Sequence, residues 1–173
     1  MRYDTWGLAL LTAALLSACN PVFNWREARF DNAPLVALLP CKPDKGVRSL
    51  PVADRVVEVS MQGCEAGGVL FTVAVAQLAS PAEAGALLGP WKSAMLANAR
   101  TSQSTDQPLA VPGATPWPNA VRASFSGQRA DGSPVAAQVA LFARESQVYQ
   151  AALFADKPQP EAANTFFAGL KLP

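Results

Sequence analysis

The sequence predicts an α+β protein in which an antiparallel sheet of about five to six strands packs with two helices. Six short runs of β-branched and apolar residues are separated by turn residues. Two further segments have apolar residues at helical spacing and begin beside a proline. Half of the 173 residues are apolar and only 16% are charged, so the chain can bury the core of one domain.

The first half of the predicted sheet is one strand followed by a hairpin. Residues 34–40 (PLVALLP) form an apolar run between prolines, which is typical of a buried strand. Residues 41–46 (CKPDKG) carry turn residues. Residues 55–62 (RVVEVSMQ) alternate in polarity, and residues 69–77 (VLFTVAVAQ) are rich in β-branched side chains. The glycine-rich stretch between these two runs predicts a hairpin.

Residues 80–99 contain the clearest helical pattern. Ser80 and Glu83 form a capping box, and Pro81 occupies the first helical position. Apolar residues then follow at helical spacing on both sides of Pro90. Because the apolar stripe stays in phase across this proline, we expect a kink near residues 86–90, with a break into two short helices as the alternative.

The second half of the chain reads as a long loop, a meander and a short helix. Residues 100–118 carry four prolines and predict a surface loop. Three strand-like runs follow at residues 119–127, 135–143 and 147–155, and the short polar links between them indicate antiparallel pairing. Residues 160–169 predict the second helix, whose phenylalanines are expected to seal the core.

The N-terminal segment has the features of an export signal. After Arg2, residues 5–18 are uncharged, which is too short for a membrane-spanning helix of about 20 residues but suits the apolar core of a signal peptide. The stretch LLSAC at residues 15–19 resembles the lipobox of bacterial lipoproteins. This resemblance implies cleavage before Cys19 and attachment of acyl chains to it. The alternative is a buried N-terminal helix with Cys19 as a small core residue.

The lipobox resemblance also implies a domain organisation and a location. We expect a signal peptide at residues 1–18, a lipidated tether at residues 19–32 and a single α+β domain at residues 33–173. Asn20 stands where an aspartate would retain an enterobacterial lipoprotein in the inner membrane. The expected location is therefore the outer membrane, with the domain facing the periplasm and the membrane contacted through lipid.

Two cysteines, Cys41 and Cys64, remain in the predicted mature chain. An even number of cysteines in an exported protein favours a disulfide, which would connect the first strand to the hairpin. Closing this loop would stabilise the folded state by roughly 3 kcal/mol through the lower entropy of the unfolded chain. The alternatives are two unpaired buried thiols, a redox pair or a zinc site. The spacing lacks the C-x-x-C pattern of a redox pair, and two thiolates do not complete a zinc site without further ligands.

The sequence contains few residues suited to catalysis. It has no histidine, which rules out Ser-His-Asp and Cys-His arrangements. Lys92 and Ser93 are adjacent on the predicted helix and therefore point apart rather than forming a dyad. No phosphate-binding glycine motif occurs, and the 13 acidic residues are scattered. We therefore expect a protein that is not an enzyme and has no cofactor or metal.

Charge and aromatic residues bear on possible partners. The net charge of +1 and the scattered basic residues argue against nucleic-acid binding. Trp117, held between two prolines, is one candidate partner-binding residue, and Trp25 with Arg26 after the predicted anchor is another. For both tryptophans the alternative is docking onto the protein's own domain.

Three stretches carry a further resemblance: LLPCKP at residues 38–43, VYQ at residues 148–150 and FFAGLKL at residues 166–172. With the order of elements, they resemble the domain of the oxygen-evolving-complex P-subunit-like (PsbP-like) proteins and of small lipoproteins similar to them. This resemblance implies an α+β sandwich that serves accessory and assembly roles without a shared active site. The expected function is a membrane-anchored periplasmic binding or assembly module; the alternative is a carrier of a small apolar ligand between helix and sheet.

Overall fold

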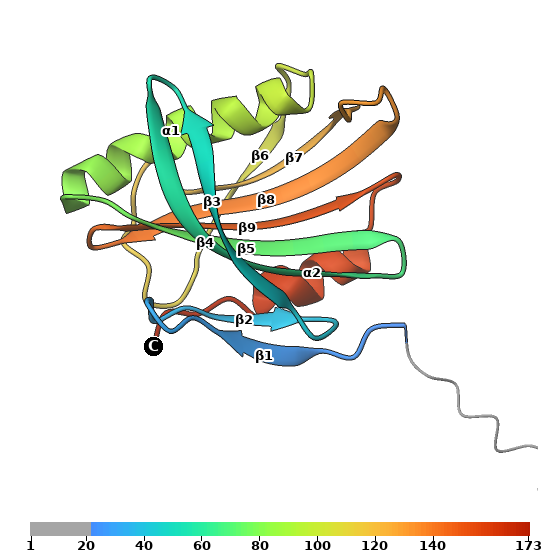
Figure 1. Ribbon diagram of the computed structural model, residues 1–173, viewed down its shortest axis with the longest axis horizontal. Coiled ribbons are helices and arrows are strands. Elements are labelled where there is room, and N and C mark those ends of the chain that lie inside the picture. Colours follow the sequence, from blue (N-terminus) through green and yellow to red (C-terminus); the bar gives the residue numbers. More distant parts are fainter. Residues whose placement is uncertain (1–21) are drawn as a thin grey trace, which may run out of the picture.

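The computed structural model describes residues 22–173, which form a seven-stranded antiparallel sheet, a two-stranded antiparallel sheet and two helices. The seven-stranded sheet has the order β3-β4-β5-β9-β8-β7-β6 (Figure 1). Its strands are β3 (Asp44–Val52), β4 (Arg55–Ala66), β5 (Val69–Gln77), β6 (Thr105–Pro108), β7 (Val121–Gln128), β8 (Pro134–Arg144) and β9 (Gln147–Ala155). The two-stranded sheet pairs β1 (Arg26–Arg29) with β2 (Val36–Leu39).

The two faces of the large sheet are covered differently. Helix α1 (Pro81–Asn98) lies across one face, and helix α2 (Pro160–Ala168) lies against the other together with β1 and β2 (Figure 1). On the α1 face, Trp91 and Leu88 pack against Leu141. On the α2 face, Phe166 meets Phe71 edge-on with ring centroids 5.4 Å apart. Both faces of the sheet are therefore covered by apolar cores, as the nearly continuous apolar sequences of the central strands β5, β8 and β9 require.

The α+β class, the antiparallel pairing and the two helices agree with prediction, but the strands outnumber the expected five to six. β3 occupies residues that include part of the predicted turn at 41–46, and β6 lies within the predicted loop at 100–118. These are the two edge strands of the large sheet, and most of their side chains are exposed. They therefore lack the apolar pattern that predicts the central strands. β1 also lies outside the predicted strands, within the predicted tether at residues 19–32.

Helix α1 begins at the predicted cap. The Ser80 hydroxyl accepts a hydrogen bond of 3.3 Å from the backbone N–H of Glu83, and Pro81 stands in the first turn. The helix continues through Pro90 to Asn98 as one element rather than as two short helices. None of the helices among residues 22–173 is long and apolar enough to cross a membrane.

The predicted disulfide between Cys41 and Cys64 is present, with Cα atoms 6.0 Å apart. It joins the end of β2 to β4, close to the turn that leads into β5. The bridge therefore connects the two-stranded sheet to the large sheet.

The residues just before this bridge also pack on the domain. Within the predicted tether, Ala28 and Phe30 are buried to 5% and 8% exposure. Val36 exchanges two backbone hydrogen bonds with Lys171, of 2.9 and 3.0 Å. The predicted signal peptide and Cys19 lie outside the described residues.

Candidate functional site

A groove with a cavity volume of about 440 Å³ lies between the second half of α1 and the sheet. This volume falls within the range of small-molecule sites. The groove exists because α1 packs closely on the alanine-rich middle of the sheet and leaves the neighbouring part of the same face uncovered. Its walls are mainly apolar, and the larger apolar side chains are those of Leu50, Met61, Leu70, Met95 and Phe154.

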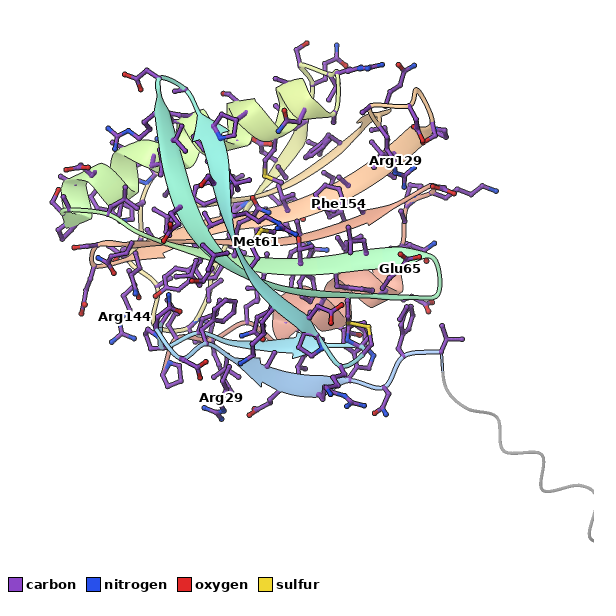
Figure 2. The ribbon with its side chains drawn as sticks, viewed as in Figure 1. Arg29, Met61, Glu65, Arg129, Arg144 and Phe154 are labelled. Carbon is purple, nitrogen blue, oxygen red and sulfur yellow. A yellow bond between two sulfur atoms is a disulfide. The ribbon has the colours of Figure 1, made fainter. Side chains whose placement is uncertain are left out.

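The apolar wall residues keep contact with solvent. Leu70 is 42% exposed, and Met61, Met95 and Phe154 are half-buried. Figure 2 labels Met61 near the centre of the view and Phe154 above and to its right, between Met61 and Arg129. Leu70 and Phe154 are register partners on β5 and β9, so they form one end of the groove together. An apolar ligand entering there would remove this surface from water, at about 25 cal/mol per Å².

A buried polar pair also lines the groove. The Trp91 indole N–H donates a hydrogen bond of 2.7 Å to Gln150 Oε1, and the two residues are only 1% and 6% exposed. Because an indole nitrogen can only donate, the amide oxygen of Gln150 must face Trp91. The amide nitrogen, Gln150 Nε2, makes no hydrogen bond to any described residue and is not sealed from solvent. Since Gln150 lines the groove, we place this donor at the groove.

Among the described residues that line the groove, Arg129 alone is charged. It lies at the rim, where it forms an ion pair of 2.8 Å with Asp156 and donates hydrogen bonds to Ser133 and to the backbone oxygen of Pro134 (Figure 2). Its charge is therefore already compensated. The groove is an apolar site whose one charged lining residue is already ion-paired, with one deep hydrogen-bond donor.

Trp117 is docked rather than projecting from its loop. Its indole ring lies over Gly85 of α1, where an added Cβ would come within 2.7 Å of three ring carbons. Among the described residues, Trp117 Nε1 has no hydrogen-bond acceptor although it is sealed from solvent. Trp117 borders a separate, more polar cleft that contains the ion pair between Lys92 and Asp106. It takes no part in the apolar groove.

The other predicted partner-binding residues lie on the opposite face of the sheet. Trp25 is half-buried and meets Phe71 edge-on, with ring centroids 5.7 Å apart. Arg26 is exposed, and its Nε donates a long hydrogen bond of 3.4 Å to the backbone oxygen of Asn24. The structure does not bring Trp25 and Arg26 together with Trp117, because Trp25 belongs to the α2-face core and Trp117 to the α1-face core.

Ionisable groups in the cores are structural. Tyr149 is buried on the α2 face, and desolvation raises the pKa of its hydroxyl to about 12. That hydroxyl donates a hydrogen bond of 2.6 Å to Gln147. Burial also lowers the pKa of Arg122, which lies 4.5 Å above the Phe167 ring. Within residues 22–173 no group of three or more histidine, cysteine, aspartate or glutamate side chains is placed to hold a metal ion.

One feature of the sequence could have indicated the groove. Val148, Gln150 and Ala152 share one face of their strand, so a glutamine interrupts an otherwise apolar face. A polar side chain in that position needs a buried partner, which the structure supplies as Trp91. Met95 and Phe154 carried no such signal, because large apolar residues in a core and in a groove look alike in sequence.

No protein-family model matches this chain, and a search of curated proteins found no match either. The class of protein is therefore defined by the fold and the site alone. It is an α+β domain with an antiparallel sheet between two helical layers and an apolar groove under one helix.

Proposed function

We propose that the protein is a lipid-anchored, non-catalytic binding module of the bacterial cell envelope, and that it holds a small apolar molecule in the groove between α1 and the sheet. The observation that carries this proposal is the groove itself: about 440 Å³, walled by half-buried apolar side chains. Such a surface left open to water is typical of a binding site rather than of a closed core.

The position of the chain entry supports anchoring beside the groove. Val22 packs against Gly67 in the turn between β4 and β5. Leu70, at one end of the groove, follows this turn glycine by only three residues in the sequence. A lipidated Cys19 would stand three residues from Val22, a reach of about 10 Å in extended chain. Acyl chains on Cys19 would thus hold the groove end close to a membrane, from which an apolar ligand can be taken or to which it can be given.

The Cys41–Cys64 disulfide supports the compartment, because structural disulfides persist in oxidising environments such as the periplasm. The anchor is tested by substituting Cys19→Ala in the full chain. We expect the unsubstituted protein to incorporate labelled palmitate and to fractionate with the outer membrane. The substituted protein should lose the label. Palmitate incorporation that persists in Cys19→Ala would contradict the lipobox interpretation.

Ligand binding is tested with N-phenylnaphthylamine, a dye whose fluorescence rises in apolar surroundings. The full-length Cys19→Ala chain, which cannot be lipidated, should bind the dye saturably. Ala94 lines the groove, so Ala94→Trp should weaken binding at least tenfold, which is about 1.4 kcal/mol. Ser93 is exposed and lies outside the groove lining, so Ser93→Trp is the matched control and should bind like the parent. Equal binding by all three chains would refute the groove as the site.

A second candidate function, assembly with an envelope protein, is favoured by the edge strand β3. One side of β3 is unpaired among the described residues. Val47 on β3 and Val56 on β4 are 57% and 73% exposed on this hairpin. A partner strand could add to such an edge. Crosslinking in intact cells through a photoreactive residue at position 47 should then yield one defined adduct, whereas a diffuse pattern or none would reject this candidate.

A further inference from the structure

We infer that the ligand of the groove is an uncharged molecule with an apolar body and one carbonyl-type hydrogen-bond acceptor, as in an ester, ketone or amide, and that this acceptor binds Gln150 Nε2. This inference rests on the proposed ligand-binding function and specifies the chemistry of the ligand. It follows from three observations: the free donor on Gln150, the apolar walls, and the absence of an uncompensated charge among the described lining residues.

The domain has two buried glutamines that differ in what their amide nitrogens do. Gln62 and Gln150 are 4% and 6% exposed, and they lie on opposite faces of the sheet. Gln62 Nε2 donates a hydrogen bond of 2.7 Å to the backbone oxygen of Arg29 and so ties β4 to β1. Gln150 Nε2 donates to no described residue. The first amide is used by the fold, whereas the second leaves its donor available at the groove.

The orientation of Gln150 is fixed by its neighbour. Trp91 occupies the amide oxygen, so rotation of the amide to present an acceptor to the groove would leave the indole N–H unsatisfied. An unsatisfied buried donor destabilises the folded protein, so this rotation is disfavoured. The groove therefore presents a donor and not an acceptor at this point. A ligand carbonyl meets this donor, whereas a purely apolar ligand would bury it without a partner.

The other polar groups near the groove do not offer a comparable contact. The Thr72 hydroxyl is directed to the backbone oxygen of Ala152, at 3.4 Å. Asn98 and Gln128 are exposed side chains at the rim. Arg129 is engaged by Asp156. A carboxylate or phosphate inside the groove would lose its hydration without gaining a free cation, which selects an uncharged ligand.

The test compares three ligands of equal chain length: methyl laurate, dodecane and laurate. Each displaces N-phenylnaphthylamine from the full-length Cys19→Ala chain at neutral pH. We expect methyl laurate to compete about fivefold better than dodecane, the effect of one added hydrogen bond, and laurate to compete less well than methyl laurate.

Two substitutions of Gln150 and one control test whether Gln150 causes the preference for methyl laurate over dodecane. Gln150→Glu keeps an oxygen for Trp91 but replaces the free donor by a carboxylate oxygen, and Gln150→Leu removes both groups. Gln150→Glu should abolish the advantage of methyl laurate over dodecane. Gln150→Leu also frees the Trp91 indole N–H, a second donor at the groove, so it should reduce this advantage without abolishing it. Gln62→Leu removes the corresponding buried amide on the opposite face, so it should keep the ligand order of the parent. Circular dichroism and unfolding curves verify that each variant is folded.

Each result has a distinct meaning. Equal competition by methyl laurate and dodecane on the parent chain would overturn the inferred hydrogen bond while leaving apolar binding intact. Laurate that competes as well as methyl laurate would overturn the uncharged class. If Gln150→Glu still prefers the ester, Gln150 does not donate the hydrogen bond to the ligand, and the inference is wrong. Failure of the dye to bind the parent chain at all would instead refute the proposed function.

Discussion

Removal of the Cys41–Cys64 disulfide should lower the free energy of unfolding by about 3.4 kcal/mol. The two cysteines are 23 residues apart, and closing a loop of this length in the unfolded chain accounts for that figure through the loop-entropy relation. The loss is large against a typical domain stability of about 5–15 kcal/mol. It corresponds to a fall in Tm of roughly 10 °C for a chain of this size. The substitution pair is Cys41→Ala with Cys64→Ala.

The assay is urea unfolding of the full-length chain followed by tryptophan fluorescence. Reduced but unsubstituted protein is the control, because it loses the same crosslink and keeps both sulfur atoms. Cys64 packs against the α2-face core, so the double substitution should be slightly less stable than the reduced protein. A stability difference below about 1 kcal/mol between oxidised and reduced protein would refute the loop-entropy reasoning. Hydrogen exchange should show the largest loss of protection in β1 and β2, which the bridge ties to β4.

Two further predictions concern α1 and the cleft beside it. Gly85→Ala places a Cβ 2.7 Å from the Trp117 ring, so it should lower the free energy of unfolding by about 1–3 kcal/mol and shift tryptophan emission to the red. Gly89→Ala is the control: its nearest contact would be at 3.8 Å, so it should be neutral or stabilising. Equal effects of the two substitutions on stability would contradict the docking of Trp117. In the folded protein the pKa of Asp106 is lowered from 3.8, chiefly by the hydrogen bond from Lys92. The ionised Asp106 therefore stabilises the fold fully above its unfolded-state pKa, and this stabilisation is lost as the pH falls through the lower pKa of the folded state. Asp106→Asn should therefore reduce stability at neutral pH and flatten the acid limb of the stability curve, and an acid limb as steep as that of the parent would show that Asp106 does not contribute.

The central part of the fold could be predicted because its strands are buried and short turns separate them. The hairpin of β4 and β5 and the meander of β7, β8 and β9 have apolar patterns set by two covered faces. The edge strands could not be predicted in the same way. All four residues of β6 are exposed, and β3 contains Pro51 and is exposed along most of its length. The pairing of both strands therefore depends on the neighbouring strand rather than on their own apolar pattern.

The candidate site was only partly predictable. A space between helix and sheet is predicted by the alternative function, a carrier of a small apolar ligand. The residues that line the groove, however, come from α1 and from six strands of the large sheet, and no local sequence pattern shows how closely a helix packs on a sheet. Trp117 and Trp25 are candidates in the sequence because Trp117 lies between two prolines and Trp25 precedes Arg26 just after the predicted anchor. In the structure both tryptophans pack on the domain, Trp25 against Phe71 and Trp117 over Gly85. The free hydrogen-bond donor at the groove is instead Gln150 Nε2.

The bridge between Val36 and Lys171 has a consequence for the order in which the protein assembles. Lys171 and Leu172 close against β2 and the loop at Pro112, so β2 is held on one side by residues that are synthesised more than a hundred positions later. If the chain crosses the inner membrane from its N-terminus, β1 and β2 emerge first and yet acquire their full set of contacts last. During that interval the apolar residues of this small sheet remain uncovered, and exposed apolar surface of this kind favours aggregation before folding is complete.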